Sequence, residues 1–162
     1  MRTNELHFKL LIPVWGESYL KRFFDLCSKS LFSEENILLL NSFKSYEIVF
    51  LTTKDSEKYI HDYFKNKHKC LKVTYIDDLL KCNSYGIILT LAYTRGVLTS
   101  STNQLDTAFM FLNADFLLSN NTIELIIQKL NSGYNGVLAI GYRCIEDESL
   151  ELIKKTDLSP RS

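Results

Sequence analysis

Asn113 and Asp115 are the residues of this chain best suited to chemistry, because they break an apolar run over 108–118. Ionised carboxylates are seldom buried without a partner or a metal, so an aspartate in this apolar run, Asp115, indicates a functional or structural role for its charge. A carboxylate and an amide two places apart at a strand end can both reach ligand oxygens. Mg²⁺ or Mn²⁺ suits them, because such cations often take one or two protein carboxylates and fill their remaining positions with water and substrate phosphates. Alternatively, Asp115 only caps the following turn.

The pattern around these residues predicts an α/β protein. Apolar and β-branched runs predict strands, and segments with helical spacing of apolar residues separate them. We expect strands at 7–15, 46–53, 71–76, 108–118 and 136–144, and helices over 20–31, 56–66, 85–98 and 121–130. Asn121 and Glu124 resemble a capping box for the last helix, and Gly96 is expected to fray the end of the third. This alternation predicts a three-layer sandwich around a mainly parallel, Rossmann-like sheet.

Parallel strands place their carboxyl ends at one edge of the sheet, where ligands bind. That rule selects the residues that follow each predicted strand: 15–17, 52–55, 77–78 and 113–115. Asp77 and Asp78 are adjacent on a strand end and should point to opposite faces, so we do not expect them to share a metal.

The chain length and composition predict one domain over 1–145 and a charged helix or tail over 146–162. Zero formal net charge leaves no electrostatic footprint for nucleic acid. No apolar stretch reaches the length of a transmembrane helix, and the N-terminus lacks the apolar region of a signal peptide, so we expect a cytoplasmic location. The four cysteines form no Cys-x-x-Cys pair and are interpreted as buried thiols.

Four short segments carry a resemblance to a known family. They are Ile-Pro-Val-Trp-Gly-Glu at 12–17, Glu-Ile-Val-Phe-Leu-Thr-Thr at 47–53, Ala-Tyr-Thr-Arg-Gly at 92–96 and Phe-Leu-Asn-Ala-Asp at 111–115. Their order is similar to that in nucleotide-sugar glycosyltransferases of the GT-A fold, family-2-like members included. The resemblance covers about 7–145, the N-terminal nucleotide-binding portion of such an enzyme.

The resemblance implies a set of site residues. The family's Asp-x-Asp motif corresponds to Asn113 and Asp115, so Asp115 would bind Mn²⁺ or Mg²⁺ and the Asn113 amide would hydrogen-bond a ribose hydroxyl. Arg95 lies in a segment where basic groups approach the diphosphate in that family. Asp55 is the nearest acid to the family's Asp-Asp after its second strand. The turn that holds the nucleotide is similar to Pro13, Val14, Trp15 and Glu17.

Several of these residues have simpler interpretations. Trp15 would either stack on a base or cover the edge of the sheet. Glu17 would equally favour the first turn of a helix, where an acid suits the positive end of the dipole. Arg95 would bind phosphate oxygens with its planar fork or stand solvated near a helix end.

We therefore expect a glycosyltransferase-like protein that binds a nucleotide-diphosphate sugar through a divalent metal. Its acceptor, a glycan, lipid or protein, is undetermined, and no general base is evident after Cys144. A non-catalytic binding or assembly module, or a fragment of a longer transferase completed by a partner chain or domain, is the alternative. A dinucleotide-dependent oxidoreductase is disfavoured, because neither Gly-x-Gly-x-x-Gly nor a P-loop occurs.

Overall fold

A computed structural model describes residues 2–65, 70–99, 102–139, 141 and 151. Four strands form one parallel sheet in the order β3-β2-β1-β4. Their bounds are β1 His7–Pro13, β2 Ser45–Thr52, β3 Leu71–Tyr75 and β4 Thr107–Phe111. The predicted α/β class and parallel central sheet are confirmed.

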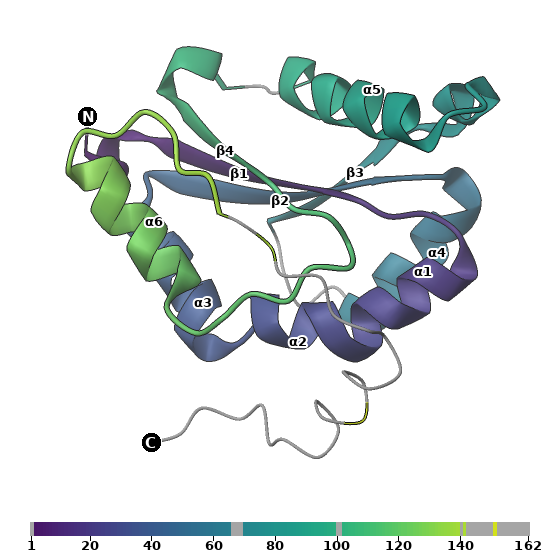
Figure 1. The fold of residues 1–162 in the computed structure, drawn as a ribbon, viewed down its shortest axis with the longest axis horizontal. Helices are drawn as coiled ribbons and strands as arrows, with labels where there is room; N and C mark the ends of the chain where they lie inside the picture. Colours follow the sequence, from purple (N-terminus) through teal and green to yellow (C-terminus); the bar gives the residue numbers. More distant parts are fainter. Residues whose placement is uncertain (1, 66–69, 100–101, 140, 142–150, 152–162) are drawn as a thin grey trace.

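Helices cover both faces of the sheet, which gives the Rossmann-like three layers that the alternation predicts (Figure 1). On one face lie α1 (Glu17–Arg22), α2 (Ser28–Leu31), α3 (Glu34–Leu39), α4 (Lys54–Phe64) and α6 (Thr122–Asn131). A π-helical turn, Phe23–Cys27, joins α1 to α2. Helix α5 (Tyr85–Leu98) covers the other face. Short 3-10 turns lie at Thr3–Glu5, Leu40–Ser42, Asp77–Lys81 and Gln104–Asp106. Among the described residues, no helix has the length and apolar character needed to cross a bilayer.

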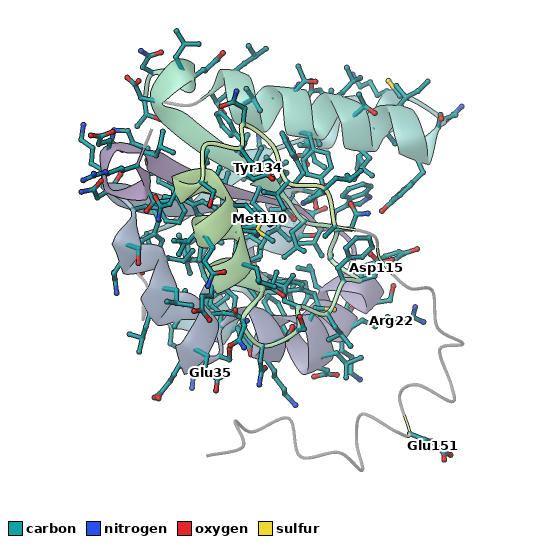
Figure 2. All side chains as sticks on the ribbon, turned by 60° about the vertical axis from the view of Figure 1, so that its left-hand side comes forward. Arg22, Glu35, Met110, Asp115, Tyr134 and Glu151 are labelled. Carbon is teal, nitrogen blue, oxygen red and sulfur yellow. The ribbon has the colours of Figure 1, made fainter. Side chains whose placement is uncertain are left out.

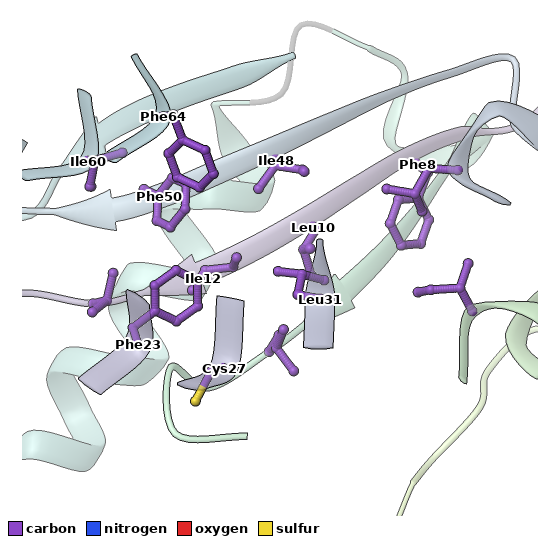
Figure 3. Packing of buried hydrophobic residues seen from close by; sticks show 14 of the residues in the cluster. Phe8, Leu10, Ile12, Phe23, Cys27, Leu31, Ile48, Phe50, Ile60 and Phe64 are labelled. Carbon is purple, nitrogen blue, oxygen red and sulfur yellow. The ribbon is translucent and has the colours of Figure 1, made fainter. Parts of the chain in front are cut away.

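The two central strands are apolar along most of their length because both of their faces are covered. Leu10, Ile12 and Phe50 point into the larger core, where Phe23 and other side chains of the α1–α4 layer meet them (Figure 3). Alternate residues of the same strands point into a smaller core beneath α5, formed by Leu11, Val49, Leu51, Ile76 and Ala92. Both faces of the sheet are therefore fixed by packing, which sets where the strand ends emerge.

Gly96 has a packing role that the helix pattern does not reveal. A Cβ at this position would lie 2.9 Å from Leu11 Cδ2 and 3.2 Å from Leu51 Cδ2. The glycine therefore lets α5 approach β1 and β2 closely. Helix α5 continues past Gly96 to Leu98, which is its predicted last residue.

The predicted strand over 108–118 is too long. β4 ends at Phe111, and the Leu112 N–H makes a last bond to the Leu11 carbonyl at 3.1 Å. The chain then turns, with the Phe116 N–H donating to the Asn113 carbonyl at 3.2 Å. Asn113 and Asp115 thus lie in a turn beyond the sheet, which is where a ligand-binding pair is useful.

Other boundaries also differ from expectation. Residues 136–139 and 141 form no strand and are exposed, and the rest of the predicted strand over 136–144 lies outside the described residues. The tail over 146–162 also lies outside them, apart from Glu151. The capping box is absent, because Asn121 has φ +68° and its side chain does not cap α6. Cys27 is buried as predicted, whereas Cys70 and Cys82 are only half-buried, and Cys144 is outside the described part.

Candidate functional site

The strand order creates a switch point between β1 and β4. The connections from β1 to β2 and from β2 to β3 carry the helices of the α1–α4 layer, whereas the connection from β3 to β4 runs through α5 on the opposite face. In parallel α/β sheets, ligands bind outside the carboxyl ends of the strands at such a point. The residues there are 14–17 after β1 and 112–115 after β4.

The turn after β1 is held by its backbone. Pro13 pairs with Leu51, and the Val14 N–H donates to the Leu51 carbonyl at 3.1 Å. Gly16 has φ +81°, a conformation that favours glycine, and its N–H donates to Ser56 Oγ at 3.2 Å. Pro13 and Val14 are buried, so these two residues shape the turn.

Trp15 and Glu17 are the side chains of this turn with access to solvent. Trp15 is half-buried against the smaller core, and its ring lies 5.6 Å from the Tyr85 ring between centroids, tilted by 33°. It therefore covers the edge of the sheet and contacts the first residue of α5, while part of its surface stays open. Glu17 is exposed in the first turn of α1, where an acid is favoured.

Asn113 is oriented by a tyrosine from α5. The Tyr93 hydroxyl donates to Asn113 Oδ1 at 2.8 Å. Burial raises the pKa of Tyr93 well above its usual range, with further contributions from Tyr85 and Asp115, so the hydroxyl keeps its proton as a donor. The amide oxygen of Asn113 already accepts this bond, and its two N–H donors can serve acceptor atoms of a ligand.

Asp115 is exposed in the same turn, and its charge reaches both neighbouring layers. It contributes to the raised pKa of Tyr85 on α5, after burial. It also contributes, again after burial, to a pKa of about 11 for Cys27 in the opposite layer. In Figure 2 the Asp115 side chain lies at a level between α5 and the helices of that layer.

Arg95 has partners away from this turn. Its Nη1 and Nη2 donate to the two Asp78 carboxylate oxygens, each at 2.6 Å, and Nη1 also donates to the Tyr75 carbonyl at 2.8 Å. This bidentate bond lowers the pKa of Asp78 to about 2. The guanidinium therefore ties α5 to the end of β3, and the strand order places β3 three positions from β4.

The acids after β2 and β3 serve other elements or face solvent. Asp77 and Asp78 lie in a 3-10 turn rather than at a strand end. The Lys54 N–H donates to both Asp77 carboxylate oxygens at 3.3 Å, so Asp77 binds the N-terminus of α4. Asp77 therefore bonds to α4, whereas Asp78 bonds to Arg95 on α5. Asp55 is exposed on the first turn of α4, after β2, with β1 between that strand and β4.

The structure thus brings Trp15, Asn113 and Asp115 to neighbouring turns and gives Arg95 a different setting. Sequence reasoning missed Tyr85 and Tyr93, which α5 brings to the same edge. The signal was available for Tyr93, since a tyrosine within an apolar helix that packs on a sheet needs a partner for its hydroxyl.

The donor set fits a divalent cation only in a limited way. Within the described ranges, no group of three or more histidine, cysteine or acidic side chains gathers around one point. Residues 112–115 contain one carboxylate, that of Asp115, and the Asn113 oxygen already accepts a hydrogen bond from Tyr93. Mg²⁺ and Mn²⁺ are compatible with such a site when ligand phosphates and water complete the coordination.

Comparisons of the chain with models of protein families, with curated proteins and with solved structures gave no match. The placement of the residues described above is therefore the basis for assigning a function.

Proposed function

We propose that the chain binds a nucleotide-diphosphate sugar at the ends of β1 and β4, as the nucleotide-binding part of a GT-A-type glycosyltransferase. The observation that supports this most is the position of the Asn113–Asp115 turn beside Trp15 at the switch point of a parallel sheet. An acid that can hold a divalent cation for a diphosphate, next to an aromatic ring that can stack on a base, suits such a ligand.

Each residue has a stated role in this proposal. Asp115 would hold Mn²⁺ or Mg²⁺, which when bound offsets the negative charge of the diphosphate leaving group. The Asn113 amide N–H groups would donate to a ribose hydroxyl, with Tyr93 fixing their direction. Trp15 and Tyr85 would offer aromatic surface to the base.

Binding should depend on the cation, because the one arginine with a candidate role is already paired. Arg95 is held by Asp78, so it does not compensate the charge of a diphosphate beside Asp115. Without a cation, Asp115 and the diphosphate carry the same sign of charge and repel each other.

Calorimetry tests this directly. We expect uridine, guanosine, cytidine or adenosine diphosphate to bind with Mn²⁺ and to lose measurable binding with chelator. Asp115→Asn should abolish the effect of Mn²⁺, whereas Asp62→Asn, an exposed acid on α4, should leave it intact. Equal affinity with and without Mn²⁺ would contradict the metal role of Asp115.

Transfer to an acceptor requires more than these residues supply. The acceptor hydroxyl must be held in line with the anomeric carbon and, for inversion, lose its proton to a positioned base. We therefore expect the 162-residue chain to hydrolyse a bound nucleotide sugar slowly and to transfer little or none. Robust transfer to a defined acceptor, lost in Asp115→Ala, would show that this chain contains the base.

A non-catalytic binding module is the second candidate, and the amide at position 113 favours it. An amide adds no charge to the cation site, and its oxygen is engaged by Tyr93. Cation-dependent binding of the nucleotide sugar with no hydrolysis over days would support this candidate over the enzyme.

A further inference from the structure

A groove lies at the opposite edge of the sheet from the turn of Asp115. It has a volume of about 240 Å³ and runs between α4 and β3. One face of α4 and the same-side residues of β3 line it: Glu57, Ile60, His61, Phe64, Leu71, Val73 and Tyr75. Neither the nucleotide site nor its proposed chemistry uses these residues.

β3 directs backbone groups outward along this groove. The Ile48 N–H of β2 donates to the Cys70 carbonyl at 3.0 Å, and the Ile76 N–H donates back to the Thr52 carbonyl at 2.9 Å. Because successive residues of a strand point their backbone groups to opposite sides, Leu71, Val73 and Tyr75 direct theirs away from β2. Of these groups, the Tyr75 carbonyl already accepts from Arg95 Nη1 at 2.8 Å, so an added strand would pair with Leu71, Val73 and the Tyr75 N–H. β3 is the last strand on this side among the strands that the structure describes. Its outer edge can therefore pair with another strand.

The middle and one end of the groove are apolar. Ile60 and Phe64 are buried on α4 and form its floor, while Leu71 and Val73 are half-buried. A strand added beside β3 would place every second side chain on this same face. Aliphatic side chains at two of those positions would cover Leu71 and Val73 and extend the larger core.

At the other end of the groove lies the carboxylate of Glu57, which accepts hydrogen bonds. The Tyr75 hydroxyl donates to Glu57 Oε2 at 2.7 Å, and His61 Nε2 lies 3.2 Å from Glu57 Oε1. These bonds lower the pKa of Glu57, so it is ionised at neutral pH. An ionised carboxylate has about four acceptor positions, which leaves room for a further donor. The Lys54 ammonium lies 5.8 Å from the centroid of the Tyr75 ring, whose hydroxyl binds Glu57, and the Lys54 backbone N–H is bound by Asp77.

We propose that this groove binds an extended peptide segment of a partner protein, which adds to the free edge of β3 as a strand. The segment carries aliphatic, aliphatic and basic side chains at alternate positions, with the lysine or arginine at Glu57. Backbone hydrogen bonds would give the affinity and the alternate side chains the specificity, as in other cases of strand addition. The proposal does not depend on nucleotide binding.

Capped synthetic peptides test the proposal on the full chain. Thr-Val-Thr-Leu-Thr-Lys-Thr offers the pattern to a parallel arrangement, and Thr-Lys-Thr-Leu-Thr-Val-Thr offers it to an antiparallel one. The controls carry glutamate in place of lysine. In NMR titrations with ¹⁵N-labelled protein, we expect one lysine peptide to bind about tenfold tighter than its glutamate control. The shifted amides should lie in 54–64 and 71–75.

Two variants separate the parts of the groove. Glu57→Gln should remove the preference for lysine over glutamate while keeping the weaker, backbone-driven binding. Val73→Pro removes an outward N–H without removing a bond to β2, and it should weaken both peptides by about tenfold or more. If Val73→Pro fails to fold, Val73→Lys blocks the groove with the backbone unchanged and should give the same loss.

Three results would overturn the proposal. They are no binding of any peptide up to about 1 mM, equal binding of the lysine and glutamate peptides, and shifted amides outside the two segments. Dimerisation of the chain through β3, seen by sedimentation and lost in Val73→Pro, would assign the edge to a second copy and would also reject it.

Discussion

Replacing Asn113 with aspartate tests whether the turn after β4 is a cation site. The variant adds a second carboxylate two residues from Asp115, and the Tyr93 hydroxyl can still donate to it. Asp115 is exposed, so a dielectric close to that of water applies. At about 5 Å, one negative charge attracts a divalent cation by about 1.7 kcal/mol under that condition. We therefore expect Mn²⁺ to bind about 10- to 20-fold tighter to Asn113→Asp.

The assay is a Mn²⁺ titration followed by electron paramagnetic resonance, with and without a nucleoside diphosphate. Asn41→Asp is the matched control, because Asn41 is exposed in the 3-10 turn before β2 and the charge change is the same. The double variant Asn113→Asp with Asp115→Asn should return to the affinity of the parent. A gain no larger than that of the control, or one that survives loss of Asp115, would refute a cation site at this turn.

Three further predictions concern packing, ionisation and pairing. Gly96→Val should destabilise the fold by about 2 kcal/mol in urea unfolding, because its added carbons meet Leu11, whereas Gly86→Ala, with open space around it, should be neutral or stabilising by up to about 1 kcal/mol. The pKa of Cys27 is raised to about 11 in the folded chain, so its contribution to stability is complete below about pH 8.5 and is lost as the pH rises towards 11. Urea unfolding from pH 8 to 11 should show this loss, and Cys27→Ala should reduce it. Asp78→Asn frees the Arg95 guanidinium and should leave nucleotide affinity in calorimetry unchanged, and a clear increase would instead place Arg95 at the diphosphate.

The apolar pattern of the sequence predicted helices and strands well where the apolar residues are also the ones that the fold buries. Helix α5 has the predicted bounds, Tyr85–Leu98, β1 lies within its predicted run, and β2 differs from its predicted run by one residue at each end, because both faces of these strands are covered. The end of β4 was not predictable in this way. Phe116 and Leu117 extend the apolar run, yet both are exposed beyond the sheet. β4 ends because its pairing with β1 ends at Phe111, and such pairing is a property of two strands, not of one.

The sequence by itself determined which residues stand at the carboxyl edge, because consecutive parallel strands send the residues that follow them to one side of the sheet. Only the tertiary structure decided which of those residues meet. The strand order places β4 beside β1. The packing of α5 brings Tyr93 within hydrogen-bond distance of Asn113 and Arg95 within hydrogen-bond distance of Asp78. The Tyr93 and Arg95 bonds join residues 20 and 17 positions apart. They depend on which face a helix covers and how closely it approaches, and local spacing carries no information on either.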